Sequence, residues 1–454
     1  MKLGKSLAAM PSSGIRDTFN LIVGKPDIIN LAPGEPNFPT PPHIVAAASR
    51  ATEAGHTKYV ENSGLPELRE QICRKLETDN GFSATPDEII VTHGAMGALY
   101  SAFAGLVEPG DEVLLPDPSW PNFRMMATLR SAKIRPYRIA AENGFLPDMA
   151  ELETLVGPAT KLLLINTPLN PIGSVIPRQR MAELLDFAAA HDLWLICDEA
   201  YDALIYSDAF VSAAALGRRE RVIAVYSFSK TYAMTGWRIG YMVVPREIAP
   251  VLADLQEAMI SCASTPGQWA ALAALEGPQD VVADMRDAYD ARRQLALDTL
   301  AQHGVPAHPP DGAFYLWIDI RAAGVPSRSF ARTLLDEHKV AIVPGLDFGP
   351  GGEGYVRASL AAPPGNIRAG LEILGQYHAR LVADAGAQVE HKRRVARVSC
   401  VDGYLAMRRD FVEFVEDPHD QLDGCRGLGT GAHRREQTDQ HDKSRDTLRG
   451  HGWS

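Results

Sequence analysis

A lysine stands where an apolar segment of the chain ends. The segment VIAVY, residues 222–226, continues into SFSKTYAMTGWRIGY, residues 227–241, which contains Lys230 and Arg238. An ammonium group at the end of a buried strand is unfavourable unless it is paired or neutral. A lysine whose pKa is lowered by its surroundings is an amine nucleophile that can form a Schiff base with an aldehyde. We therefore interpret Lys230 as a candidate nucleophile, with a surface lysine that caps a loop as the alternative.

Anion-binding groups flank this lysine. Ser227 and Ser229 offer hydroxyl donors, and the fork-shaped guanidinium of Arg238 suits a phosphate. A second anion site is indicated at HGAMGALYS, where Gly94 opens a helix of small residues with free N–H groups. The aldehyde and the phosphate would then belong to one ligand.

Other polar side chains would complete such a site. Asp198 directly follows the apolar run LWLIC and could pair with a protonated heteroaromatic nitrogen, or else cap a helix. Asn170 and Tyr201 could bond a phenolic oxygen on the same ring, and Trp120 offers a flat face for stacking, although each also suits a turn or the core. A phosphorylated pyridine aldehyde with a phenolic oxygen is pyridoxal 5′-phosphate (PLP), whose sites combine a lysine with a partner for the ring nitrogen.

The elements that position these residues are short apolar runs that alternate with amphipathic segments. The runs are DEIIVTHG, DEVLLPDPS, TKLLLINTP, LWLICDEA and RVIAVYSFSK. Alternation of this kind predicts a parallel sheet covered by helices. Ligands of such sheets bind beyond the carboxyl ends of the strands, where the candidate residues fall.

The predicted fold class is α/β, a large domain whose mostly parallel sheet has helices on both faces, with a smaller α+β domain. Residues 1–44 are rich in Pro and Gly and should run over a surface or line a cleft. By resemblance to a known family they would join the small domain and cover the active site, and 45–275 would form the large PLP-binding domain. Residues 276–378 are expected to form the small domain, and 379–454 a polar, flexible tail with little apolar content.

The composition excludes several classes of protein. The formal net charge of −11 gives no support for nucleic-acid binding, and we expect no nucleic-acid partner. The five cysteines are scattered and never form CxxC, which argues for a reducing compartment and against a metal site. No apolar run approaches the roughly 18 residues that span a bilayer. We therefore expect a cytoplasmic protein without a membrane partner.

The sequence resembles a fold-type I aminotransferase of class I/II, the aspartate aminotransferase family, from about residue 12 to about residue 378. The resemblance is carried by LAPGEPNFPTP, TKYVENSGLPELRE, NPIG, CDEAYD, SFSKTYAMTGWRIGY, VPGLDFG and VRASLA, in the family's order and spacing. The sequence departs from the usual NPTG at Ile172, and Met96 replaces a polar residue that often contacts phosphate.

The resemblance assigns a role to each matching residue of the cofactor site. Lys230 would form the Schiff base with PLP, Asp198 would pair with the ring nitrogen, and Tyr201 and Asn170 would bond the phenolic oxygen. Trp120 would stack on the ring. The phosphate would be held by Ser227, Arg238 and the Gly94 turn, with the backbone of Ala95 and Met96.

The resemblance also implies how substrates bind and how subunits pair. Arg357 would grip the α-carboxylate of the amino acid, near Trp120 and Asn170, and Gly34 would lie in the segment that covers the substrate. Tyr59 would reach the phosphate of the neighbouring subunit, which implies a homodimer with shared active sites.

The implied activity is ping-pong transfer of an amino group from an L-amino acid to a 2-oxo acid, through the Lys230 Schiff base and pyridoxamine phosphate. Two alternatives stay open at this point: a PLP-dependent carbon–sulfur β-lyase, and a non-catalytic PLP-binding regulatory or interaction protein. The sequence identifies no second arginine for a distal carboxylate, and the substrate side chain is left open.

Overall fold

The computed structural model describes residues 3–387 of the chain. Its centre is a seven-stranded sheet with the order β2-β8-β7-β6-β5-β3-β4. The strands are β2 (Ile89–His93), β3 (Glu112–Asp117), β4 (Lys133–Arg138), β5 (Thr160–Asn166), β6 (Trp194–Asp198), β7 (Val222–Ser227) and β8 (Ile239–Val243). Each of the five predicted apolar runs is one of these strands, and the expected mostly parallel α/β fold is confirmed.

Strand β8 is the exception to the parallel arrangement. It pairs antiparallel with β2 on one side and with β7 on the other, so that β2 and β7 run in the same direction. The remaining neighbours, β7 to β4, are parallel. The carboxyl ends of all five predicted strands therefore meet at one edge, which is where the candidate residues follow them.

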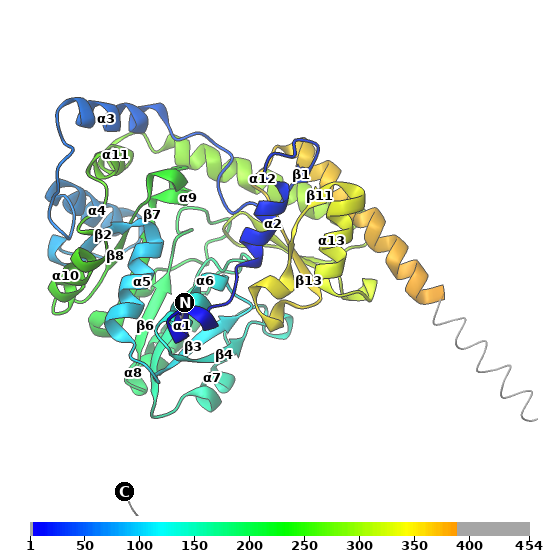
Figure 1. The fold of residues 1–454 in the computed structure, drawn as a ribbon, viewed down its shortest axis with the longest axis horizontal. Helices are drawn as coiled ribbons and strands as arrows, with labels where there is room; N and C mark the ends of the chain where they lie inside the picture. The colour runs from blue at the N-terminus through cyan, green and yellow to red at the C-terminus, as the bar shows by residue number, and fades with distance from the viewer. Residues whose placement is uncertain (1–2, 388–454) are drawn as a thin grey trace, which may run out of the picture. The chain divides into compact units, whose positions relative to one another are not determined.

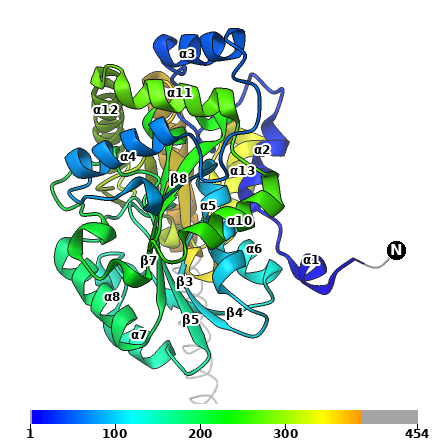
Figure 2. The same cartoon turned by 90° about the vertical axis from the view of Figure 1, so that its left-hand side faces the viewer.

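Helices cover both faces of this sheet, as Figures 1 and 2 show. The elements α5, α6 and α10 pack on one face, and α3, α4, α8 and α11 on the other. Side chains alternate between the two faces, so that Ile196 and Val225 face α5 whereas Leu195 and Tyr226 face the opposite layer. The helices between β1 and α12 are α3 (Pro42–Glu53), α4 (Pro66–Asp79), α5 (Gly94–Leu106), α6 (Pro121–Leu129), α7 (Met149–Leu155), α8 (Arg178–Ala190), α9 (Phe228–Thr231), α10 (Ala249–Ile260) and α11 (Thr265–Glu276).

A second, smaller sheet follows the long helix α12 (Asp280–Gln302). It has the order β12-β13-β10-β9 and is antiparallel throughout. Its strands are β9 (Ala307–His308), β10 (Tyr315–Asp319), β12 (Val343–Pro344) and β13 (Tyr355–Ser359), and α13 (Ser327–His338) lies between β10 and β12 in the chain. Its buried face packs against α12 and against the helical residues 364–387.

The N-terminal segment contributes two helices and one strand. The helices are α1 (Lys5–Ala9) and α2 (Gly14–Ile22), and the strand is β1 (Ile29–Asn30). Strand β1 pairs in parallel with β11 (Val340–Ala341), through Ile29 opposite Val340. The two strands form a separate two-stranded sheet. The segment after β1 is linked to the smaller sheet by a hydrogen bond of 2.7 Å from the backbone N–H of Ser359, on β13, to the backbone oxygen of Leu31. Figure 1 shows α2, in dark blue, beside the yellow elements of that sheet.

Short 3₁₀ turns connect many of these elements. They are η1 (Pro86–Glu88), η2 (Ala141–Asn143), η3 (Ala213–Leu216), η4 (Arg219–Arg221), η5 (Thr235–Trp237), η6 (Arg321–Ala323), η7 (Gly345–Phe348) and η8 (Pro350–Gly352).

The tail expected from residue 379 lies only partly within the described chain. The helix over 364–387 continues past residue 378. Residues 388–454 lie outside the described residues, and the expectation of flexibility stays a prediction for them. Within residues 3–387, no helix has the length and apolar character needed to cross a membrane. The same residues contain no group of three metal-ligating side chains, and Cys73, Cys197 and Cys262 are free thiols.

Candidate active site

A cavity of about 490 Å³ lies at the carboxyl ends of the parallel strands. This volume is in the range of small-molecule sites, roughly 300–1,000 Å³. The sequence-predicted residues that line it are Gly34, Ala95, Met96, Trp120, Asn170, Asp198, Tyr201, Ser227, Lys230, Arg238 and Arg357. The structure therefore brings together residues that are separated by more than 300 positions in the chain.

Lys230 enters the cavity from the short helix α9, which begins directly after β7. The turn is fixed by Ser227, whose hydroxyl accepts a hydrogen bond of 3.1 Å from the backbone N–H of Ser229. The Lys230 ammonium donates a bond of 2.5 Å to the backbone oxygen of Gly34. Burial lowers the pKa of Lys230 to about 8. About a tenth of the lysine is thus neutral at pH 7, and about half at pH 8.

Asp198 ends strand β6 and is 4% exposed. Its Oδ1 accepts a hydrogen bond of 3.1 Å from the backbone N–H of Ala200, and no helix begins there. The alternative of a helix N-cap is therefore wrong. Burial raises the pKa of Asp198 to about 7. A buried carboxylate with so few donors is suited to a cationic partner within the cavity.

Arg357 lines the cavity from β13 and is 1% exposed. Its Nη1 donates a bond of 3.0 Å to Asn170 Oδ1, and its Nη2 a bond of 2.7 Å to the backbone oxygen of Ala32. The Cζ atom is 4.3 Å from the ring centre of Tyr315 and 4.9 Å from that of Phe348. Within the described residues, its buried Nε has no hydrogen-bond partner. The orientation of the guanidinium is thus fixed by the two rings and the two hydrogen bonds, and it can still donate a hydrogen bond to an anion.

The two tyrosines of the cavity form a pair. Tyr201 Oη lies 2.8 Å from Tyr315 Oη, and the ring planes meet at 78°. Burial raises the pKa of both phenols, and that of Tyr201 rises well above its usual range. Both hydroxyls therefore keep their protons at physiological pH.

A compact cradle forms where α5 begins beside Arg238. Gly94 has a φ of +67°, and a Cβ atom there would lie 2.6 Å from Arg238 Nη2. A Cβ atom at Gly240 would likewise lie 2.6 Å from the backbone nitrogen of Ala95. Gly94 thus lets the guanidinium approach the first turn of α5, and Gly240 lets strand β8 approach it. The N–H groups and the dipole of that turn attract anions. Arg238 Nη1 is itself held by the backbone oxygen of Thr235 at 2.7 Å.

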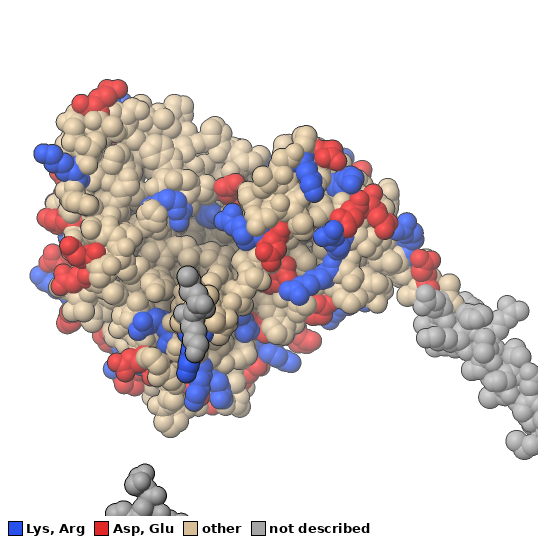
Figure 3. Space-filling view, in the orientation of Figure 1, with Lys and Arg blue, Asp and Glu red and all other residues tan. Residues whose placement is uncertain are grey.

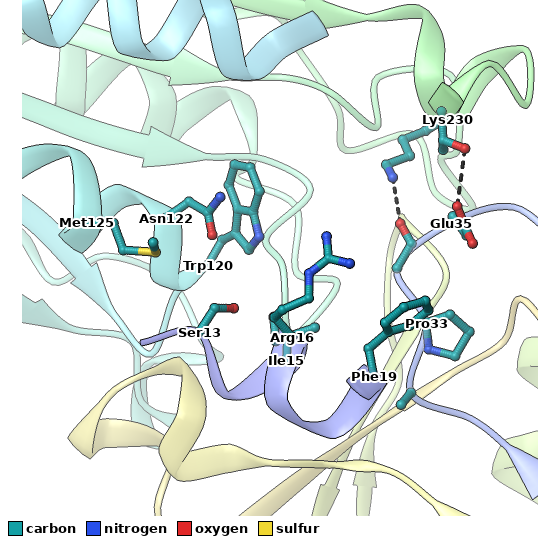
Figure 4. Close-up of a pocket in the computed structure, with 13 residues that line it drawn as sticks. Ser13, Ile15, Arg16, Phe19, Pro33, Glu35, Trp120, Asn122, Met125 and Lys230 are labelled. Carbon is teal, nitrogen blue, oxygen red and sulfur yellow. Dashed lines mark hydrogen bonds between the residues drawn. The ribbon is translucent and has the colours of Figure 1, made fainter. Parts of the chain in front are cut away.

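Trp120 comes directly before α6 and lines the cavity beside Asn122. Its ring packs edge-on against Phe123, with centroids 5.5 Å apart. Figure 4 shows the indole on one side of the cavity, with Lys230 on the other. The flat ring is thus placed where a planar ligand could stack.

Two predicted residues do not line the cavity. Gly94 lies just behind it, where the missing side chain leaves room for Arg238. Tyr59 is 84% exposed and belongs to none of the cavity walls described here.

The outer half of the cavity brings in residues that sequence reasoning missed. Arg16 and Phe19 come from α2, and Glu35 and Met125 from other segments. Figure 4 shows the Arg16 guanidinium directed between Trp120 and Lys230, and Figure 3 shows a hollow in this face with Lys and Arg side chains at its edge. Helix α2 was not predicted, because residues 1–44 are rich in Pro and Gly, which are typical of loops. Tyr315 was missed because its apolar neighbours in FYLWIDI read as core.

Comparison with known sequences places these features in a family. Residues 26–374 match the model of the family "Aminotransferase class I and II". The chain is 41% identical to an aspartate aminotransferase of Pyrococcus abyssi, over 80% of this chain and 94% of the relative. It is 37% identical to aromatic-amino-acid aminotransferase 2 of Thermococcus litoralis, over 80% of this chain and 94% of that protein.

Solved structures are similar as well. The aspartate aminotransferase from Thermus thermophilus with maleate superposes with a TM-score of 0.79 at 36% identity, over 83% of this chain and all of the other. The aromatic aminotransferase from Pyrococcus horikoshii superposes with a TM-score of 0.75 at 38% identity, over 80% of this chain and 98% of that one.

Proposed function

The chain belongs to the class I and II aminotransferase family, and from that premise we propose how its cavity transfers an amino group and which residues take part. The chain is a transaminase, an enzyme that moves an amino group between an amino acid and a 2-oxo acid. The relatives do not favour the carbon–sulfur β-lyase or the non-catalytic regulator. The cofactor, the residue roles and the substrate class are the proposals that follow.

PLP fits the residues that line the cavity. The cradle of Gly94, Ala95 and Arg238 suits the phosphate, and the N–H groups of α5 would receive it. Asp198 would pair with a cationic ring nitrogen, and Trp120 would offer its face to the ring. These are three separate chemical demands of one ligand, met within one cavity of about 490 Å³.

The observation that carries this proposal is Lys230 in a common cavity with Asp198. PLP, when bound, supplies an aldehyde carbon for amines and a ring that disperses negative charge from the substrate's Cα. The lowered pKa of Lys230, about 8, allows its nitrogen to act as a nucleophile and afterwards to take a proton from the substrate. When PLP is bound, Asp198 would keep the ring nitrogen cationic by pairing with it in a buried setting.

Arg357 and Gly34 are proposed to hold the amino acid. The guanidinium of Arg357 is pre-oriented by Asn170 and by the ring of Tyr315. A planar guanidinium held in this way can bind an α-carboxylate by two parallel hydrogen bonds, which fixes the orientation of the Cα–H bond. Asn170 and Tyr201 would bond the phenolic oxygen of PLP, and Ser227 would add a hydroxyl for its phosphate.

The outer cavity supports a dicarboxylic substrate. With Arg238 assigned to the phosphate and Arg357 to the α-carboxylate, Arg16 is the remaining arginine of the cavity walls in the described part of the chain. Among residues 3–387 Arg16 makes a cation–π contact of 5.2 Å with Phe19 and no ion pair. The Thermus relative was solved with maleate, a dicarboxylate, and the Pyrococcus abyssi relative is named for aspartate. We therefore propose aspartate or glutamate as amino donor and the matching 2-oxo acids as acceptors.

A homodimer and a cytoplasmic location complete the proposal. The exposed Tyr59 phenol would serve the phosphate of a second subunit, which accounts for its absence from the walls of its own cavity. The free thiols of Cys73, Cys197 and Cys262 suit a reducing compartment.

The proposal is tested by reducing the purified enzyme with borohydride and mapping the modified peptide. We expect a single PLP adduct on Lys230, and aspartate should convert the visible band to that of the pyridoxamine form without an oxo acid. An adduct on another lysine would contradict the assignment. Release of ammonia and pyruvate without an acceptor would instead indicate a lyase.

A further inference from the structure

Tyr315 touches the groups that surround the reacting centre although it lies on the smaller sheet. It is the first residue of β10 and is 1% exposed. Its hydroxyl contacts Tyr201 at 2.8 Å, and its ring lies 4.3 Å from the guanidinium carbon of Arg357. A Cβ atom at Gly34 would come within 2.9 Å of the same hydroxyl. The Tyr315 side chain thus lies against Tyr201, proposed to bond the phenolic oxygen, against Arg357, proposed to bind the α-carboxylate, and against Gly34 of the covering segment.

The register of the smaller sheet explains how Tyr315 meets Arg357. In the antiparallel pair β10–β13, Tyr315 lies opposite Ser359 and Trp317 lies opposite Arg357. Residues two apart on a strand share a face, so the tyrosine ring and the guanidinium are diagonal neighbours on one face. The contact is therefore set by the backbone pairing of two strands, which keeps it rigid.

The number of hydrogens on the two phenols indicates which tyrosine donates the hydrogen bond between them. Both phenols are neutral, so the two oxygens share two hydrogens, of which one can lie between them. The Tyr315 hydroxyl makes this one hydrogen bond within the described residues, and Arg357 beside it offers only donors. Among the described residues, Tyr201 is therefore the acceptor within reach of the Tyr315 hydroxyl. Both tyrosines line the cavity, and Tyr201, the one proposed to contact the phenolic oxygen of PLP, can turn its own hydrogen toward that acceptor.

We propose that Tyr315 is a positioning residue: its hydroxyl donates to Tyr201, so that Tyr201 directs its hydrogen at the phenolic oxygen of PLP, while its ring keeps the Arg357 guanidinium flat. This inference rests on the proposed function of the cavity. Hydrogen bonds in a chain strengthen one another, so the Tyr315 bond makes Tyr201 a better donor. A stronger hydrogen bond from Tyr201 would make the phenolic oxygen of PLP a weaker acceptor. A proton on the neighbouring Lys230 nitrogen would then be held less tightly and be lost at a lower pH.

The experiment compares holoenzymes by the pH at which their visible absorbance band changes. Tyr315→Phe removes the hydroxyl and keeps the ring that faces Arg357. We expect the midpoint to rise by about half to one pH unit, as expected for the loss of one hydrogen bond. Turnover should fall by about 3- to 10-fold with the KM for the amino acid nearly unchanged, since the carboxylate clamp is intact.

Tyr137→Phe is the matched control. Tyr137 is also buried, and its hydroxyl also donates a hydrogen bond of 2.8 Å, to the backbone oxygen of Leu164 on strand β5 of the large sheet. It does not line the active-site cavity. We expect this variant to leave the absorbance midpoint in place. An equal shift in both variants would overturn the proposal by showing a general effect of lost packing or stability.

A double substitution separates this inference from the proposed function. In a Tyr201→Phe background, Tyr315→Phe should not change the pH midpoint of the absorbance band any further. The Tyr201 hydroxyl, through which Tyr315 is proposed to act, is already absent there. An unmoved midpoint in Tyr315→Phe, with the band present, would overturn the role of Tyr315 alone. A fully additive shift in the double variant would also overturn it. Absence of the visible band from the wild-type enzyme supplied with PLP would instead refute the proposed function, and with it this inference.

Discussion

The ammonium of Lys230 donates a hydrogen bond of 2.5 Å to the backbone oxygen of Gly34. The bond joins the segment after β7 of the large sheet to the N-terminal segment just after β1. That N-terminal segment is in turn bonded to β13 of the smaller sheet, through Leu31 and Ser359. The proposed nucleophile is thus held by the segment proposed to cover the substrate. When Lys230 takes part in chemistry, this bond must be given up, so the covering segment is coupled to the state of the lysine.

Gly34→Ala is expected to disturb this covering segment. The added Cβ would lie 2.9 Å from the buried Tyr315 hydroxyl, so the free energy of unfolding should decrease by about 1–3 kcal/mol. Urea unfolding measures the change. Gly236→Ala is the control, because a Cβ there meets nothing within 4 Å. Adding Tyr315→Phe to Gly34→Ala should recover part of the loss, and failure to recover any would show that the strain lies elsewhere.

Lys230→Met should stabilise the cofactor-free protein at pH 7. Burial lowers the pKa of Lys230 from 10.5 to about 8, so the folded state holds the charged lysine at a cost of about 3 kcal/mol. The unfolded chain binds more protons than the folded one between pH 8 and 10.5, so wild-type stability rises with pH across that window. The advantage of the methionine variant should therefore shrink from pH 8 to pH 10. An advantage that is constant with pH would contradict a buried, titrating Lys230.

The sequence allowed the large sheet to be predicted because its parallel strands are buried on both faces and read as apolar runs. The antiparallel strand β8 (IGYMV) and the edge strand β4 (KIRPYR) were not predicted. The basic residues of β4 reflect its exposed edge position and obscure the apolar alternation. The short strands β1 and β11 have two residues each, too few for any periodicity to appear.

The sequence allowed a residue's placement in the cavity to be predicted where the residue lies at the end of a strand or just after it. Asp198 and Lys230 are examples, because the strand fixes where its last residues emerge. Arg16 and Tyr315 reach the cavity through tertiary packing, since α2 and β10 are brought there by contacts that no local pattern encodes. Tyr59 and residues 388–454 remain predictions from the sequence.

Asp198→Asn should bind PLP and lose most of its rate. The amide has a similar shape but no charge, so it cannot hold a proton on the ring nitrogen. We expect the half-reaction with aspartate to slow by at least about 100-fold, the lower end of what proton-transfer groups contribute. Stopped-flow absorbance measures this rate, and the visible band reports bound cofactor. A variant with bound PLP and an unchanged rate would mean that the ring nitrogen has another partner.

Arg16→Gln should act on dicarboxylic substrates alone. If Arg16 pairs with the distal carboxylate, its removal should lower kcat/KM for aspartate and glutamate by about 10- to 100-fold, as expected for a charged hydrogen bond. Alanine has no distal carboxylate, so its kcat/KM should change by less than about 2-fold by the same reasoning. Arg286→Gln is the control, because it removes an arginine that is paired with Asp287 and lies outside the cavity. An equal loss for alanine and aspartate would assign Arg16 to the structure of α2, and no loss for aspartate would remove it from substrate binding.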